Sequence, residues 1–119
     1  MKNYSQRKGK EYEIAIAHLL SQFFDEDVRR YGAQEKWKSF SGDIRSKNKD
    51  SILNDYHLEL KKRETWAVLA WYKKAKDDTD SFKTPIVVCS RNHEDDYVFF
   101  RLKDFLKLLL ELDGFRKGI

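Results

Sequence analysis

The chain has 119 residues, of which 40% are hydrophobic and 14% aromatic, so it can build one modest core and is too short for a second domain. Although 37% of the residues are charged, eight Phe, six Tyr and three Trp exclude a disordered chain. A net charge of +4 at pH 7 favours polyanionic partners such as nucleic acid, but only mildly. We therefore expect a single domain over residues 1–119.

The only cysteine, Cys89, lies in an apolar run that begins at Ile86. A single cysteine cannot form an internal disulfide, and its place in an apolar run predicts a buried thiol in a reducing compartment. The first ten residues are polar and basic, and no apolar stretch approaches the length needed to cross a membrane. These features predict a soluble protein of the cytoplasm.

The first half of the chain predicts one helix and three strands. Apolar residues recur at helical spacing over Glu11–Phe24, at Tyr12, Ala15, Ile16, Leu19, Leu20 and Phe23. Short strands follow over Val28–Tyr31 and Asp43–Ser46, and between them lies a loop, Gly32–Ser41, that carries Lys36, Trp37, Lys38 and Phe40. After a polar turn, Tyr56–Lys62 alternates as a third strand. The three strands should form a meander.

The second half predicts helices at its two ends with strands between them. Glu64–Asp78 has helical composition without Gly or Pro, and Pro85–Cys89 and Tyr97–Phe100 predict strands on either side of a turn at His93–Asp96. A leucine-rich helix over Leu102–Leu112, ended by Gly114, closes the chain. The order αβββαββα predicts an α/β fold with a mixed β-sheet flanked by helices.

The third strand carries the most informative pattern. Strand alternation places Glu59 and Lys61 on one face and turns Leu60 to the other. A carboxylate beside an ammonium suits phosphodiester hydrolysis, in which the carboxylate holds a divalent cation and the lysine steadies a water or the developing charge. Asp43, after the small Gly42, supplies a second carboxylate. On the Glu-x-Lys pattern alone, the solvated face of an ordinary strand is the favoured alternative.

The first helix adds a third acidic candidate. A helical wheel places Glu13 inside the apolar arc, whereas Glu11 falls on the polar side. A carboxylate among apolar neighbours needs a lysine, a metal or a metal-bound water as partner. The alternative is a residue at the rim of the core whose carboxylate reaches solvent.

Four segments follow one another along the chain. They are Arg7-Lys8-Gly9 followed by Glu13, Gly42-Asp43, Glu59-Leu60-Lys61 and the helix that includes Trp66–Ala75. In the order of these four segments, the chain resembles the PD-(D/E)xK nuclease superfamily. The likeness is to its archaeal-type Holliday junction resolvases and to related phage proteins in particular. One departure is that Asp43 follows Gly rather than Pro, a variation common in the superfamily.

This resemblance implies a restriction-endonuclease-like core and a bound Mg²⁺ or Mn²⁺ ion. The metal ligands would be Asp43, Glu59 and the backbone carbonyl of Leu60, with Glu13 bound directly or through water. Lys61 would orient the attacking water. A phage-encoded protein that acts in the host cytoplasm is one form this implies.

Two basic clusters lie near the candidate residues in the sequence. Arg7, Lys8 and Lys10 lead into the first helix, and Lys62 and Arg63 extend the third strand. Both clusters are expected to flank the proposed metal. On the second helix one side carries Trp66, Lys73 and Lys74, which could touch DNA, and the other carries Val68, Trp71, Tyr72 and Ala75, which should be core. Contacts of this kind hold DNA by its phosphates. Each basic cluster taken singly could instead be a solvated face.

The three histidines and the last helix carry further signals. His18, His57 and His93 are far apart and offer no zinc spacing, and His57 is more readily a surface or hydrogen-bonded histidine than a neighbour of the metal. The last helix carries more apolar surface than a small domain easily covers, so it indicates a two-fold homodimer, unless it is simply a central core helix.

The sequence as a whole predicts a Mg²⁺-dependent DNA endonuclease, with a Holliday junction resolvase as first choice. A nuclease for other branched, linear or single-stranded DNA would carry the same motifs. A non-catalytic DNA-binding module of the same fold and an interaction protein that uses the leucine-rich helix remain the alternatives from other classes.

Overall fold

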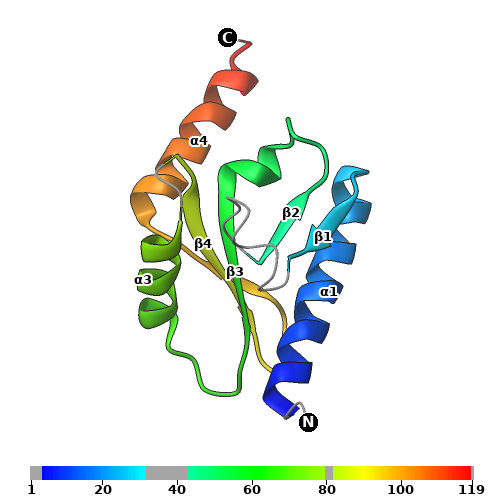
Figure 1. Ribbon diagram of the computed structural model, residues 1–119. Coiled ribbons are helices and arrows are strands. Elements are labelled where there is room, and N and C mark those ends of the chain that lie inside the picture. Colours follow the sequence, from blue (N-terminus) through cyan, green and yellow to red (C-terminus); the bar gives the residue numbers. More distant parts are fainter. Residues whose placement is uncertain (1–3, 32–42, 80–81, 119) are drawn as a thin grey trace.

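The computed structural model describes residues 4–31, 43–79 and 82–118 (Figure 1). The predicted loop Gly32–Ser41 and Gly42 lie outside these residues. The helices and strands follow the predicted order, which confirms the α/β class. They are α1 (Tyr4–Phe24), β1 (Val28–Arg30), β2 (Ile44–Ser46), the 3-10 helix η1 (Ile52–Asp55), β3 (Tyr56–Lys62), α3 (Val68–Asp78), β4 (Thr84–Ser90), β5 (Tyr97–Phe99) and α4 (Leu102–Arg116).

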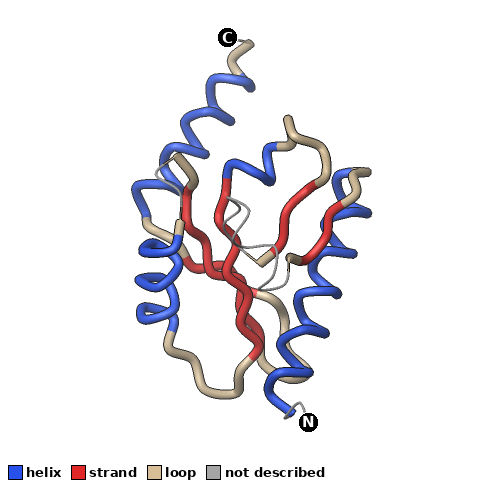
Figure 2. The backbone as a smooth tube through the Cα atoms, in the orientation of Figure 1, coloured by secondary structure: helices blue, strands red, loops and turns tan. Residues whose placement is uncertain are grey.

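The strands form two units rather than the predicted meander. β3 pairs with β4 in parallel and β4 pairs with β5 antiparallel, so this three-stranded sheet is mixed, as expected. β1 and β2 form a separate antiparallel pair. The expectation that β2 pairs along β3 is wrong, because β2 has only three residues and η1 turns the chain before β3 begins. The mixed sheet runs through the middle of the molecule in Figure 2, with its strands in red.

Each face of the mixed sheet has its own hydrophobic core, which follows from strand alternation. Leu58 and Leu60 of β3 face α1 and join a cluster that also contains Tyr12, Ile16, Ala17, Val28 and Ile44. Val87 and Cys89 of β4 point to the opposite face, where they pack with Tyr72 of α3. Cys89 is buried and has a free thiol, as predicted. The two helices therefore cover opposite faces, and β3 lies between them (Figure 1).

The first helix differs from its predicted length and face. It begins at Tyr4 rather than Glu11, and its buried side is formed by Tyr12, Ile16 and Ala17. Leu19 and Phe23, which were expected in the core, are 44% and 80% exposed. On a helical wheel Leu19 falls at the edge of the face that Tyr12, Ile16 and Ala17 form. Phe23 falls on the same side as Ile16, but it lies in the last turn of the helix.

The second helix starts later than predicted. It begins at Val68, and Trp66 precedes it in the loop after β3. The indole Nε1 of Trp66 is within hydrogen-bonding distance of the carbonyls of Arg63 (3.0 Å) and Ser90 (3.3 Å), which fixes the ring against the core. The prediction that Trp66 lies on the DNA-facing side of the helix is therefore wrong. The predicted core face is confirmed, with Tyr72 and Ala75 buried.

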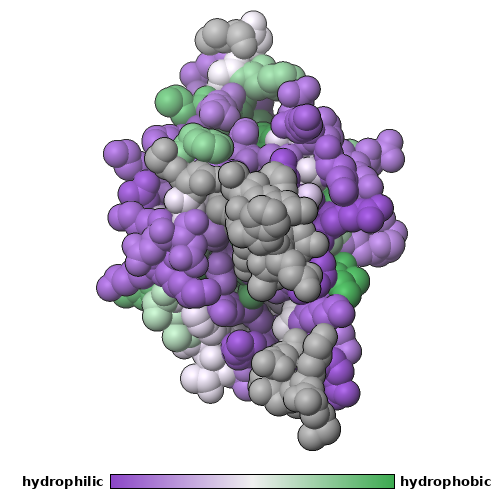
Figure 3. All heavy atoms as spheres, viewed as in Figure 1, coloured by the Kyte–Doolittle hydropathy of each residue, from purple (hydrophilic) through white to green (hydrophobic). Residues whose placement is uncertain are grey.

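The last helix projects beyond the sheet toward the C-terminus (Figure 1). It runs through Gly114 to Arg116, so Gly114 does not end it, and the positive φ of 75° falls at Gly118 instead. Only Asp104 of this helix is buried, so the alternative of a central core helix is wrong. Its exposed apolar residues are Leu102, Phe105, Leu106, Leu109, Leu110, Leu112 and Phe115. Hydrophobic side chains show at this end of an otherwise mainly hydrophilic face in Figure 3.

None of the helices in the described part of the chain is long and apolar enough to cross a membrane.

Candidate active site

Asp43 joins the two strand units. Its backbone N–H donates to the carbonyl of Leu58 at 2.8 Å, and its own carbonyl accepts from Tyr31 at 2.9 Å. The side chain makes a third connection, because Oδ2 accepts a hydrogen bond of 2.8 Å from the backbone N–H of Leu60. Asp43 is 5% exposed. The buried carboxylate of Asp43 thus accepts a backbone hydrogen bond from β3 that the carbonyl of a neighbouring strand would accept in a regular sheet.

The bond to Asp43 also sets the direction of the Leu60 carbonyl. The N–H and C=O of one strand residue point to the same edge, so the Leu60 carbonyl faces the side on which Asp43 lies. A cleft of about 320 Å³ opens at this edge of β3. Ten residues line it: Gly9, Lys10, Glu13, Arg30, Asp43, Glu59, Leu60, Lys61, Arg63 and Lys74.

Glu59 is buried in this cleft among three potential cations. Its Oε2 lies 3.9 Å from Nζ of Lys61 and 3.7 Å from Nζ of Lys74. Its Oε1 lies 3.4 Å from Nε2 of His57, which is itself 2% exposed. Burial alone raises the pKa of Glu59, but the hydrogen bond with His57 and the charges of Lys74 and Lys61 outweigh it and hold the pKa below the usual value for glutamate. Glu59 is therefore an ionised carboxylate.

His57 is the residue of the site that sequence reasoning weighed too lightly. Because an ionised carboxylate only accepts hydrogen bonds, the imidazole donates to Glu59 from Nε2. The histidine is hydrogen-bonded, as expected, but it is buried rather than on the surface. Its Nδ1 is buried and has no partner within the described structure. The shared strand face of residues 57 and 59 was the sequence signal.

Glu13 reaches the cleft from α1. Its Oε1 accepts from Nε of Arg30 at 3.1 Å, so a cation from β1 partners this carboxylate. The helical wheel had placed Glu13 toward the sheet, and the structure places it in the same cleft as Asp43 and Glu59. Glu11 lies on the other side of the helix. Arg30 was missed because only the β1–β2 register, which pairs it with Ile44 beside Asp43, brings it here.

The oxygen ligands suit a hard divalent cation, although they do not form a closed cage. No group of three or more His, Cys, Asp or Glu side chains in the described residues converges to hold a metal. Mg²⁺ is usually bound by one or two carboxylates and keeps several waters. Asp43, Glu59 and the Leu60 carbonyl fit that pattern, and an all-oxygen set disfavours a soft metal.

The cleft carries a positive balance, with five basic side chains against three carboxylates. Arg63 and Lys74, both predicted DNA contacts, are among the five. Three other predicted contacts, Arg7, Lys8 and Lys62, line a separate pocket on the far side of α1. The exposed Lys73 lines neither. The arrangement can hold a phosphate and neutralise charge that develops on it.

Comparison with known protein families gives one match. A family model described as phage putative PDDEXK endonuclease matches residues 4–115, nearly the whole chain. No curated protein and no solved structure matches this chain. The match spans α1 through α4 and so includes every residue of the cleft. The chain belongs to this family and is a nuclease of the PD-(D/E)xK type.

Proposed function

We propose that the protein is a Mg²⁺- or Mn²⁺-dependent DNA endonuclease that hydrolyses phosphodiester bonds in the cleft of Asp43, Glu59 and Lys61. The observation that carries this proposal is the buried carboxylate of Asp43, which the Leu60 amide fixes beside the ionised Glu59. The link to Leu60 does not require a charged side chain, because the amide oxygen of an asparagine could accept the same hydrogen bond. Two carboxylates and a lysine held at one edge of β3 instead suit chemistry on a phosphate.

The metal would be held by Asp43, Glu59 and the Leu60 carbonyl. When bound, it would polarise the scissile phosphate and lower the pKa of a coordinated water. Glu13 would contribute through a water molecule, because Arg30 engages its carboxylate. His57 would keep Glu59 ionised and in place through its Nε2 hydrogen bond. Asp43 needs no side-chain partner to hold its rotamer, because the backbone N–H of Leu60 in β3 orients Oδ2.

Lys61 would act on the water and the phosphate. Its Nζ lies 3.9 Å from Oε2 of Glu59, beside a proposed metal ligand, which supports a role in holding the attacking water. An ammonium there would stabilise the negative charge that develops on the oxygens of the pentacoordinate transition state more than the charge of the bound substrate. Lys61→Ala should therefore slow single-turnover cleavage and leave DNA affinity nearly unchanged. A defect confined to affinity would contradict this role.

DNA would be held by its phosphates through Arg7, Lys8, Lys62, Arg63, Lys73 and Lys74. Release of counterions makes such binding fall steeply with salt, with a slope of about −0.9 per phosphate contacted on duplex DNA. Affinity measured from low to high salt tests the proposal. A flat response would favour the interaction-protein alternative.

Among DNA substrates, we propose a four-way junction, cut by a homodimer in the cytoplasm. One small site cuts one strand at a time, so resolution needs two sites related by a two-fold axis. The exposed apolar surface of α4 supports such a dimer, since Leu102 and Leu110 are 69% and 72% exposed. Covering this surface with a second copy would remove apolar area from water.

Light scattering with and without junction DNA tests the dimer. Labelled junction, flap, duplex and single-stranded DNA, each offered with Mg²⁺, test the substrate. Paired nicks in the junction by a dimer support the resolvase. A monomer on DNA that cuts linear duplex as fast as junctions would leave a nuclease for other DNA, and binding without cleavage of any substrate would leave the non-catalytic module.

A further inference from the structure

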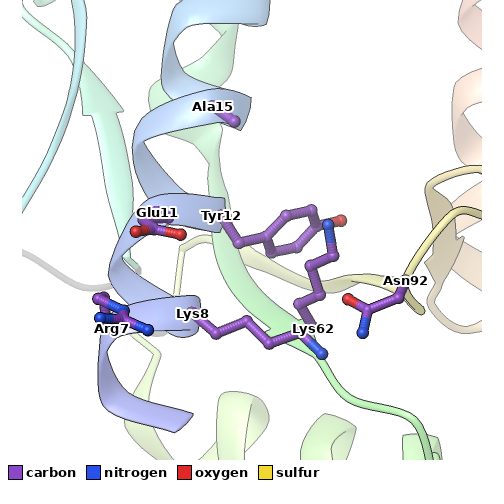
Figure 4. Close-up of a pocket in the computed structure, with 7 residues that line it drawn as sticks. All are labelled: Arg7, Lys8, Glu11, Tyr12, Ala15, Lys62 and Asn92. Carbon is purple, nitrogen blue, oxygen red and sulfur yellow. The ribbon is translucent and has the colours of Figure 1, made fainter. Parts of the chain in front are cut away.

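A second pocket lies on the opposite side of α1 from the catalytic cleft. Figure 4 shows the residues that line this pocket. It has a volume of about 480 Å³, against about 320 Å³ for the cleft. Its lining comes from three elements: Arg7, Lys8, Glu11, Tyr12 and Ala15 of α1, Lys62 at the end of β3, and Asn92 in the turn between β4 and β5. None of these residues lines the catalytic cleft.

Strand and helix periodicity explain why the two sites share elements without sharing residues. Lys61 of β3 and Arg63 just after it line the catalytic cleft, whereas Lys62 between them lines the second pocket. Along α1, Gly9, Lys10 and Glu13 line the cleft, whereas Lys8, Glu11 and Tyr12 line the pocket. The N-terminal half of α1 is thus a ridge with a basic site on each side.

The shape of the pocket is fixed by contacts within the protein. The Tyr12 hydroxyl donates to Oδ1 of Asp96 at 2.7 Å, and Nζ of Lys62 lies 5.7 Å from the centre of the Tyr12 ring. The Ser90 hydroxyl lies within hydrogen-bonding distance of the carbonyls of Arg91, Glu94 and Asp95, which braces the turn that carries Asn92. The pocket is therefore formed before any ligand arrives.

The charges that line the pocket indicate what it binds. Three basic side chains, Arg7, Lys8 and Lys62, line the pocket with one carboxylate, Glu11. Lys8 also lies 3.9 Å from the exposed carboxylate of Glu64, which is not part of the lining. The lining still carries more positive than negative charge. Like charges gathered in a concave site repel one another, and a bound anion relieves that repulsion. The Asn92 side chain adds an uncharged amide that can donate hydrogen bonds. In Figure 4, Lys8 and Lys62 extend into the space between the helix and Asn92.

We propose that this pocket binds a backbone phosphate of the DNA other than the phosphate that is cut. The inference rests on the proposed function, because it takes DNA as the substrate and adds a second contact to it. The pocket and the cleft lie on opposite sides of α1, and an α-helix is about 10–12 Å across. This separation is too wide for adjacent phosphates of one strand. The phosphate in the pocket is therefore not the immediate neighbour of the scissile one.

Two substitutions that each lower the net charge by one test the pocket. Lys62→Gln removes a cation, and Asn92→Asp replaces an amide donor with a carboxylate. DNA affinity of both should fall at all sequences, and for Lys62→Gln the slope of affinity against salt should become shallower by about 0.9. Lys49→Gln, an equal change at an exposed lysine in the turn after β2, is the control and should leave affinity and slope as in the wild type. Affinity is measured in chelator, and thermal melting verifies the fold.

The contact is then located on the DNA by replacing single phosphates with uncharged methylphosphonates. At one position away from the cut site, the replacement should weaken binding by the wild-type protein but not by Lys62→Gln, as expected when both changes remove the same interaction. Either of two results would overturn the proposal. In the first, Lys62→Gln and Asn92→Asp bind DNA with the affinity and salt slope of the wild type. In the second, each methylphosphonate weakens binding by the wild type and by Lys62→Gln equally at every position. A wild-type protein that binds through this pocket but cuts no DNA would instead refute the proposed function alone.

Discussion

The backbone N–H of Leu60 and the carboxylate of Asp43 form a hydrogen bond of 2.8 Å in a buried position. The same aspartate is bound through its main chain to Leu58 and Tyr31, so it holds the β1–β2 pair against β3. A side chain proposed to bind metal is therefore also a structural link between the two strand units. Substitutions at Asp43 should reveal both roles, and they can be separated.

Asp43→Asn should abolish cleavage but preserve most of the stability. The asparagine carbonyl can still accept from Leu60, whereas the charge needed for a cation is lost. Cleavage should fall by more than about 100-fold, since even outer-shell partners of a metal cost about 10–100-fold. Asp43→Ala should in addition lower the free energy of unfolding by about 1–3 kcal/mol, because the Leu60 amide loses its partner.

Cleavage assays and denaturant unfolding of the two Asp43 variants give both quantities. Equal stability of Asp43→Asn and Asp43→Ala would show that the bond to Leu60 contributes nothing. Cleavage by Asp43→Asn at the wild-type rate would remove Asp43 from the site.

Glu13→Gln should reduce Mg²⁺-dependent cleavage more than Glu11→Gln does. Glu13 lies in the cleft with Arg30, and Glu11 lies on the opposite side of α1. The two changes have the same chemistry on the same helix, so each controls for the other. Rates measured over a range of Mg²⁺ concentrations should show a higher Mg²⁺ requirement for Glu13→Gln only. The reverse order would mean that the cleft is not the site of reaction.

His57→Leu should slow cleavage because Glu59 loses the donor that holds its Oε1. His57→Asn keeps an N–H donor on a shorter side chain and should recover part of the rate. Thermal melting verifies that both variants fold, and DNA affinity in chelator should match the wild type. If His57→Asn is no faster than His57→Leu, the N–H donor does not account for the role of the histidine. If both variants cut at the wild-type rate, His57 does not position Glu59.

Glu26 should make stability depend on pH. Hydrogen bonds with Ser51 and Ser46 lower the pKa of Glu26 in the folded protein, with a further contribution from Asn48. The Ser46 hydroxyl donates to its Oε1 at 2.8 Å. A lowered pKa means that this contribution is present above the pKa of an unfolded glutamate, about 4.3, and is lost as the pH falls through the folded pKa.

Unfolding of wild type and Glu26→Gln is therefore compared from neutral to acidic pH. The wild type should be the more stable at pH 7, and the difference should shrink as the pH falls below about 4. A difference that stays constant over this range would show that the carboxylate charge makes no net contribution.

The elements that the sequence predicted best are those whose pattern is local. Tyr56–Lys62 matches β3 at both ends, because strict alternation over a seven-residue strand leaves little freedom in its boundaries. The position of Glu13 followed from a helical wheel in the same way. Glu59 and Lys61 were placed on one face by alternation, and the structure brings them to one cleft.

The features that were missed depend on contacts between distant segments. Arg30 reaches Glu13 only through the β1–β2 register. The hydrogen bond between Asp43 and Leu60 joins two segments that are not paired strands, so no local sequence pattern predicts it. Trp66 was predicted to be helical because the composition of Glu64–Asp78 fits a helix, but hydrogen bonds to Arg63 and Ser90 hold it in the loop before α3. Tertiary contacts decided these three cases.

Cleavage of labelled DNA by the purified wild-type protein and by Glu59→Gln, with Mg²⁺ and with chelator, decides whether the cleft is a metal-dependent active site. We predict strand cleavage by the wild type in Mg²⁺ alone, and none by Glu59→Gln in either condition although it still binds the DNA. Cleavage that persists in chelator, or in Glu59→Gln at the wild-type rate, would contradict a metal-dependent site at Asp43 and Glu59.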